Sequence, residues 1–485
     1  MVFGNGRTLL GRARLNKFLT LATWVRALWK RLDLFDLGYS ATAMLCAMYL
    51  LPPLWAFLFG GQSMAAGNAK YLTYQSITYS ILGVVSFAVG YWLLWRLVPR
   101  SGQQAPVQQW KKWDSQRVAW VAGGVLLFGI SIKLYRVFNG SYLSYMYANR
   151  DSPLFMFKYF ISLNQFFYVA LAIAFAHYYT LLKSGDAGAR TWGRIAWTGF
   201  MFCVICGLLA PGGRFAVLLP FLVFLVTRHY LYKPSGNLTF GAVLLFVFVL
   251  SPFKGVSRDM VILEEYLPSG IFKVDPSLSW DNRDLLDLVY YSLMGNTKVS
   301  GSGDVRSALH GSGRLIVNST LGRVNHSHVL AIIVKQYQTR ELLLGRTIPF
   351  FLNWLMVPKS WIESVVGTKM DASFGQDSGL TSDSLTGVGW TCMGDWYQNF
   401  GLAGLIGGMA LIGVVFRIIF RRLVGAGATS GIFIYSLLWP ILIHGLEQSL
   451  ASFIGEGLKM FAILYGVQWM LSFPGTPVAG TRVRV

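Results

Sequence analysis

Arg214 stands in a context that suits phosphate binding. It follows two glycines in the stretch Pro211-Gly212-Gly213-Arg214, at the expected start of a helix. A guanidinium beside the unpaired N–H groups and the positive dipole of a helix N-terminus is well placed to bind a phosphate or diphosphate. The alternative is an anchor whose guanidinium extends to the lipid headgroups at a membrane surface.

A second stretch combines an arginine with two histidines. Arg323, His326 and His328 lie close together in the sequence. Arg323 could supply a second cation to the same phosphates, and either histidine could take or give a proton near neutral pH. Two histidines at this spacing also suit zinc, but no third ligand at metal spacing accompanies them. A polar surface turn is the ordinary alternative.

Asp395 belongs to a polar and aromatic stretch, Gly394-Asp395-Trp396-Tyr397, just before an apolar segment. Its carboxylate could accept a sugar hydroxyl, and the rings of Trp396 and Tyr397 could stack on a pyranose. Trp and Tyr also form the aromatic belts of membrane proteins at the interface with water. Both interpretations stay open.

Other candidate groups carry weaker signals. Cys203 and Cys206 have CxxC spacing, but they lie in an apolar run without a second pair or a neighbouring histidine, which gives little support to a metal or redox role. Further ionisable groups fall on the outer side of the topology expected below: Arg136, Arg150, Arg258, Arg314, His444, Glu447 and Glu456. So many ionisable groups on one face suggest a site there.

The composition indicates an integral membrane protein. Hydrophobic residues make up 54% of the 485 residues, charged residues make up 13%, and the mean hydropathy is +0.49. A helix needs about 20 apolar residues to cross the hydrocarbon layer. By that measure the sequence predicts about ten spans, at 37–59, 72–97, 117–137, 155–182, 195–210, 214–232, 238–254, 402–420, 431–450 and 455–473.

The distribution of charge orients these spans. If both termini are cytoplasmic, 22 of the 42 basic residues fall on the inner side, as the positive-inside rule expects. The long insertion before the eighth span has nearly equal numbers of basic and acidic residues and falls outside. The net charge of +21 therefore reflects topology, and no nucleic-acid partner is expected.

The expected organisation has five parts. Residues 1–36 form a basic, amphipathic cytoplasmic segment suited to an anionic membrane surface, with a disordered tail as the alternative and no removable signal peptide. Residues 37–254 hold transmembrane helices 1 to 7, and residues 255–395 form a large extracytoplasmic (periplasmic) loop with interfacial helices. Residues 396–473 hold helices 8 to 10, and residues 474–485 form a cytoplasmic tail.

Several stretches resemble the bacterial oligosaccharide repeat-unit polymerases, the Wzy or O-antigen polymerase family. Segment 345–361 is similar to the part of the family that precedes its closing motif, and segment 394–404 is similar to the closing motif itself. Segments 211–214 and 323–325 resemble the family's Arg-containing helix start and its Arg-apolar-Asn triplet. In this chain the acidic position is Asp where Glu is common, and Gly213 replaces a common Ser.

The resemblance implies an all-α polytopic membrane protein with a GT-C-like glycosyltransferase architecture. It would polymerise oligosaccharides linked to undecaprenyl diphosphate on the outer face of the bacterial inner membrane, without a metal or other cofactor. The implied partners are the lipid-linked donor and acceptor, membrane lipids, a chain-length regulator and a flippase. Residues 60–71, the expected first outer loop, hold no carboxylate for a divalent cation, so arginine would neutralise the leaving group.

The resemblance also implies roles for the residues that could do chemistry. Diphosphate binding falls to Arg214 and Arg323, with Arg150 and Arg258 as weaker candidates. His326 or Asp395 would deprotonate or orient the acceptor hydroxyl, while Trp396 and Tyr397 would contact the sugar. An O-antigen ligase, a transporter or flippase for lipid-linked sugars, and a structural subunit of an envelope assembly are the alternative functions.

Overall fold

The computed structural model describes residues 33–58, 73–97, 113–138, 164–209, 215–234, 238–239, 241, 326–355, 357, 359–367, 391–425 and 427–472. All regular secondary structure in these ranges is helical, which confirms the expected all-α class. The basic N-terminal segment, most of the seventh span, the first part of the long insertion and the C-terminal tail lie outside the described residues.

Most of the described helices fall within segments that the sequence predicts as spans. Those in the first two predicted segments are α2 (Leu37–Leu45), η1 (Cys46–Leu50) and α3 (Leu51–Leu58), then α4 (Tyr74–Trp92) and η3 (Leu94–Leu97). The next four are α5 (Ser115–Phe138), α7 (Asn164–Ser184), α8 (Ala189–Leu209) and α9 (Phe215–Leu231). The insertion contributes α14 (Ser327–Tyr337), η6 (Ile348–Leu355) and α15 (Lys359–Val366). The last three are α17 (Cys392–Leu423), α18 (Thr429–Gly445) and α19 (Leu450–Ser472).

Several of these helices have the length and composition of membrane spans. Within the described residues, three qualify by both measures: Phe166–Ser184, Cys392–Leu423 and Leu450–Ser472. Two shorter helical stretches, Val217–Leu231 and Thr429–Gly445, are also apolar. On α19, Met460 and Leu464 are buried, while Phe461 and Trp469 are exposed. A helix that is apolar on both its buried and its exposed face is typical of a membrane protein.

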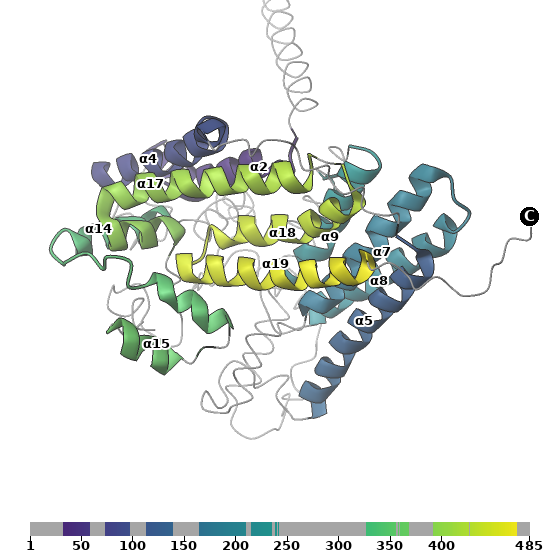
Figure 1. Cartoon of the computed structure of the whole chain (residues 1–485). Helices are drawn as coiled ribbons and strands as arrows, with labels where there is room; N and C mark the ends of the chain where they lie inside the picture. The colour runs from purple at the N-terminus through teal and green to yellow at the C-terminus, as the bar shows by residue number, and fades with distance from the viewer. Residues whose placement is uncertain are drawn as a thin grey trace, which may run out of the picture.

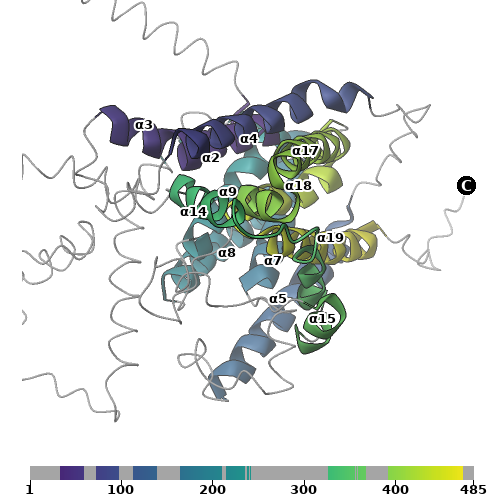
Figure 2. The ribbon, with the colours of Figure 1, turned by 90° about the vertical axis from the view of Figure 1, so that its left-hand side faces the viewer.

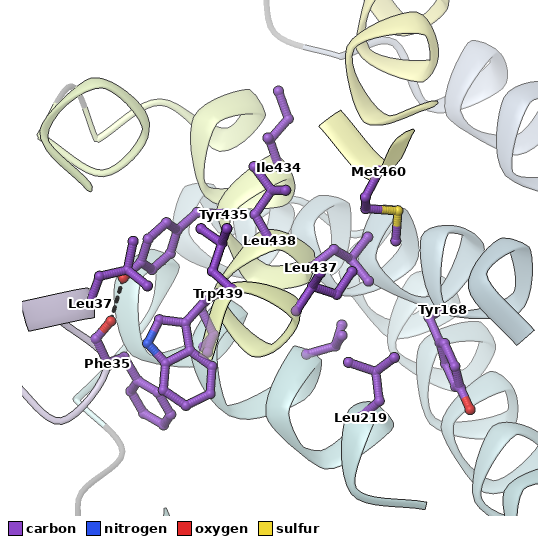
Figure 3. Close-up of a cluster of buried hydrophobic side chains, with 14 of the residues drawn as sticks. Phe35, Leu37, Tyr168, Leu219, Ile434, Tyr435, Leu437, Leu438, Trp439 and Met460 are labelled. Carbon is purple, nitrogen blue, oxygen red and sulfur yellow. Dashed lines mark hydrogen bonds between the residues drawn. The ribbon is translucent and has the colours of Figure 1, made fainter. Parts of the chain in front are cut away.

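α18 forms the centre of the bundle. Figure 1 shows α17, α18 and α19 side by side, with α4 against α17 and α14 beyond one end, and Figure 2 gives the view turned by 90°. Figure 3 shows Tyr435, Leu438 and Trp439 of α18 among side chains from neighbouring elements, with the Tyr435 hydroxyl donating to the carbonyl oxygen of Phe35. α18 is apolar on nearly all sides, as expected of a helix that is surrounded by other helices or by lipid.

Two sets of contacts join the ends of different helices. In the predicted topology, the ends that each set joins lie on the same side of the membrane. At one end, Asp36 accepts a hydrogen bond of 2.6 Å from the Tyr91 hydroxyl and pairs with Arg417 at 3.4 Å. At the other end, the side-chain amide of Gln338 donates to Gln75 at 2.6 Å. These contacts therefore hold different helices together at two opposite ends of the bundle.

The first part of α17 folds back at Gly401. This residue has φ 64° and ψ −153°, a combination that is essentially restricted to glycine. The ring of Trp396 lies so close to Gly408 that it leaves no room for a side chain there. In a straight helix these two residues would be about 18 Å apart along the axis. Residues 392–400 therefore pack against the helix that begins at residue 402, where the eighth span was expected to start.

Replacement of Gly401 by alanine should destabilise the protein by about 1–3 kcal/mol, because the side chain makes the observed φ and ψ unfavourable. Gly407→Ala is the matched control, since Gly407 lies on the same helix and no heavy atom is within 4 Å of an added Cβ. Thermal unfolding in detergent, followed by circular dichroism, measures both variants. Equal melting temperatures for the two would contradict a glycine-dependent reversal.

Candidate functional site

The turn between α18 and α19 carries a pair of ionisable groups. His444 lies in the last turn of α18, and the backbone N–H of Glu447 donates to its carbonyl oxygen at 3.0 Å. This turn brings Nδ1 of His444 to 3.6 Å from Oε2 of Glu447, with the two side chains 31% and 30% exposed. The distance suits an ion pair when the imidazole is protonated.

The first residue of α9 packs on His444. The rings of Phe215 and His444 are stacked, with centroids 4.4 Å apart and an interplanar angle of 19°. Arg214 is the residue before Phe215, and it lies outside the described residues. Three other candidates for diphosphate binding also lie outside them: Arg150, Arg258 and Arg323. Their roles stay predictions.

His326 lies immediately before α14 and contacts the first span. Its backbone N–H donates to the carbonyl oxygen of Met48 at 3.1 Å, within the π-helical turn η1. Its ring centroid is 6.3 Å from that of Tyr49. Nδ1 of His326 is buried and has no hydrogen-bond partner among the described residues. Such a nitrogen leaves one hydrogen-bonding position for a ligand or water.

The charge state of His326 links it to the α18–α19 turn. Burial lowers the pKa of His326 below the ordinary histidine value, because the imidazolium loses hydration. Glu447 acts in the opposite direction and His444 lowers the pKa further, so both groups lie near enough to affect it. The net effect of burial and of the two charges is a lowered pKa, so the imidazole of His326 is mainly neutral near pH 7. The neutral imidazole is the form that accepts a proton. His326, His444 and Glu447 therefore form a cluster in the electrostatic sense, because the charges of His444 and Glu447 act on His326.

Asp395 occupies a structural position that the sequence does not reveal. The sequence predicts that it lies at the outer boundary and can reach a sugar hydroxyl, but the structure buries it completely. One carboxylate oxygen accepts a 2.6 Å hydrogen bond from the backbone N–H of Leu450, the first residue of α19, and the other accepts from the amide of Gln398. A carboxylate is stabilised by the exposed N–H groups and the dipole of a helix start. Asp395 therefore ties α17 to α19.

The two aromatic side chains after Asp395 pack inside the protein. The indole of Trp396 lies over Gly408. The ring of Tyr397 is 5.5 Å from that of Tyr79 on α4, and Tyr397 is buried. Sugar stacking by these two residues stays a prediction, because in this structure their rings contact protein groups.

The two C-terminal stretches that carry the family resemblance contact each other. The backbone N–H groups of Leu343 and Leu344 donate to the carbonyls of Gln398 and Asn399 at 3.0 and 2.9 Å. The side-chain amide of Asn399 donates to the hydroxyl of Thr347 at 2.6 Å. Segment 343–347 thus takes up the carbonyl groups left unpaired where the short helix 392–400 ends. Sequence reasoning identified both stretches but not their contact.

Comparison with protein-family models, curated proteins and solved structures finds no match to the chain. Among the described residues, no group of three or more His, Cys, Asp and Glu side chains could hold a metal ion. The sequence signal for the cluster was the spacing of His444 and Glu447, which places both on one side of a helical turn. Nothing in the sequence indicated that Phe215 packs on His444.

Asp395→Ala should lower the free energy of unfolding by about 1–3 kcal/mol, because two buried donors lose their acceptor. Glu341→Ala is the control, since Glu341 is exposed, and it should change stability by no more than about 0.5 kcal/mol. Titration with SDS in detergent micelles compares the two. An Asp395→Ala protein as stable as the control would show that this carboxylate does not hold α19.

Proposed function

We propose that the chain is a glycosyltransferase of the repeat-unit polymerase type. It transfers a growing oligosaccharide from undecaprenyl diphosphate to a terminal hydroxyl of the next lipid-linked unit, on the outer face of the bacterial inner membrane. One observation supports the proposal: the charges of His444 and Glu447 act on His326 at one end of the bundle, and two candidate arginines, Arg214 and Arg323, are close in sequence to residues of this group. Phe215, which follows Arg214, stacks on His444.

The transfer step needs a base and a cationic site. The O–H bond of the acceptor breaks, its proton goes to an imidazole nitrogen of His326, and the oxygen attacks the anomeric carbon of the donor. The bond from that carbon to the diphosphate breaks, and its electron pair leaves with the diphosphate. Arg214 and Arg323 neutralise the added negative charge, with Arg150 and Arg258 as further candidates.

The structural contacts favour His326 over Asp395 as the base. Both oxygens of Asp395 already accept hydrogen bonds inside the protein, whereas Nδ1 of His326 has no partner among the described residues. In the proposal, Asp395 positions α19 and the turn that carries His444 and Glu447. His326 then receives the acceptor proton and passes it to water.

Substitution of Arg214 by alanine should reduce polymer synthesis by about 10²-fold or more, because a cation on the departing diphosphate is lost. The full-length protein in nanodiscs receives lipid-linked repeat units extracted from host cells that lack it, and gels report the product ladder. Arg422→Ala is the control, an exposed cation in the last turn of α17, and should form normal ladders. Normal ladders from Arg214→Ala would refute its role.

The same assay separates the alternative functions. An O-antigen ligase uses a similar donor but a different acceptor, so lipid-linked units alone would give no ladder. A transporter or flippase would move labelled substrate across proteoliposomes and form no new glycosidic bond. A wild-type protein that does either of these, and makes no ladder, would contradict the polymerase proposal.

His326→Gln should lower the rate by roughly 10²-fold, the usual effect of losing a general base. Since only the neutral imidazole accepts a proton, the wild-type rate should fall as the pH drops through the lowered pKa of His326, below the ordinary histidine value of about 6.5. The variant should lose this acid limb. His229→Gln, at the opposite end of the bundle, should keep both the rate and the limb. An unchanged pH profile in His326→Gln would exclude His326 as the base.

A further inference from the structure

The pair formed by His444 and Glu447 has no part in the proton transfer assigned to His326. Its two groups are 3.6 Å apart and nearly one third exposed, so the pair is neither a fully buried structural contact nor a freely solvated one. It borders the same cluster as His326 and packs on Phe215. A partly exposed pair of ionisable groups beside a proposed anion site is a candidate for a chemical role.

We propose that His444, held in its protonated form by Glu447, binds a phosphate oxygen of the polyprenyl diphosphate. This inference deepens the proposed function and rests on it. Protonated His444 would be a further cation beside the expected arginines, and its sequence context alone indicates no role for it. The ligand chemistry is that of a lipid-linked diphosphate whose negative charge increases as the sugar leaves.

The contacts of His444 fix its ring and leave one edge open. The flat face stacks on Phe215 at 4.4 Å, and Nδ1 is directed at the Glu447 carboxylate. Among the described residues, no hydrogen-bond partner contacts Nε2. A protonated imidazole oriented on one side by a carboxylate can donate from its other nitrogen to an anion.

One carboxylate distinguishes two neighbouring histidines. His444 has Glu447 at ion-pair distance, and an adjacent negative charge favours the protonated ring. His326 has a buried nitrogen without a partner among the described residues and stays neutral. A cation for the leaving group and a base for the acceptor therefore lie in one cluster. Three other titratable groups interact electrostatically with this pair: Tyr49 of η1, His326, and Glu456 of α19. Lys459 of α19 acts in turn on Glu456.

The direct test measures binding of undecaprenyl diphosphate to the full-length protein in nanodiscs, with undecaprenol as the uncharged reference. His444→Gln should weaken the affinity for the diphosphate about tenfold, equivalent to about 1.4 kcal/mol, and leave undecaprenol unaffected. His444→Arg should retain tight binding, because arginine supplies a permanent cation. A general base at this position would not be replaced by arginine, so this variant distinguishes the two roles.

Variation of pH adds a second readout. Wild-type affinity should fall as the pH rises through the pKa of the imidazolium, while His444→Arg should show no such fall. Glu447→Gln should bind like wild type near pH 5.5 and about tenfold more weakly near pH 8, since the amide no longer stabilises the charged ring. His229→Gln is the matched control: its histidine pairs with Asp33 at 3.2 Å at the other end of the bundle, and it should bind like wild type.

The outcomes separate this inference from the proposed function. A wild-type protein that prefers undecaprenol or shows no preference would overturn both. If wild type prefers the diphosphate and His444→Gln binds it equally well, only the role of His444 is overturned. If His444→Arg elutes as a folded protein on size exclusion and binds as weakly as His444→Gln, the cation role is also overturned. Retained binding in His444→Arg with loss in His444→Gln supports it.

Discussion

The reversal of the backbone at Gly401 is the constraint on which this end of the protein depends. It turns the short helix 392–400 back against the rest of α17 and brings Asp395 to the start of α19. The helix end leaves carbonyl groups that need donors, and in apolar surroundings an unpaired backbone group is costly. Leu343 and Leu344 supply those donors. The reversal, segment 343–347 and the first turn of α19 therefore form as one unit.

Hydrogen-bond satisfaction separates structural from chemical groups. Burial raises the pKa of Asp33, but hydrogen bonds from His229 and Tyr230 outweigh it and hold the pKa below the ordinary value. That cluster pairs its groups with one another, as a structural contact should. At the other end, His326 keeps an unpartnered nitrogen among the described residues, and the pair of His444 and Glu447 is partly open. Groups with unused hydrogen-bonding capacity are the ones available to a ligand.

Much of the fold follows from hydropathy, and much of the site does not. The lengths of the apolar runs in the sequence predicted most of the described helical segments. The eighth was expected to start at residue 402, and the structure has a helix that begins there, just after Gly401. Residues 392–400 precede the expected eighth span, yet the hydroxyl of Thr391 caps them as a helix and most of them are buried. The carboxylate of Asp395 in this helix accepts a hydrogen bond from Leu450, far along the chain. The pattern of residues within one segment does not show which residue far along the chain it will contact.

The contrast between Asp395 and His326 shows why residue type alone misassigns roles. A carboxylate in a stretch expected to contact a sugar is a natural candidate for a base, but this one already accepts hydrogen bonds from Leu450 and Gln398. Taking a further proton there would weaken the contacts that hold α19, and with them the turn carrying Glu447. A buried neutral imidazole has a vacant lone pair and no such structural duty. If the chain transfers sugars, the proton and the leaving-group charge are therefore best handled by histidine and by cations, while the carboxylates position both.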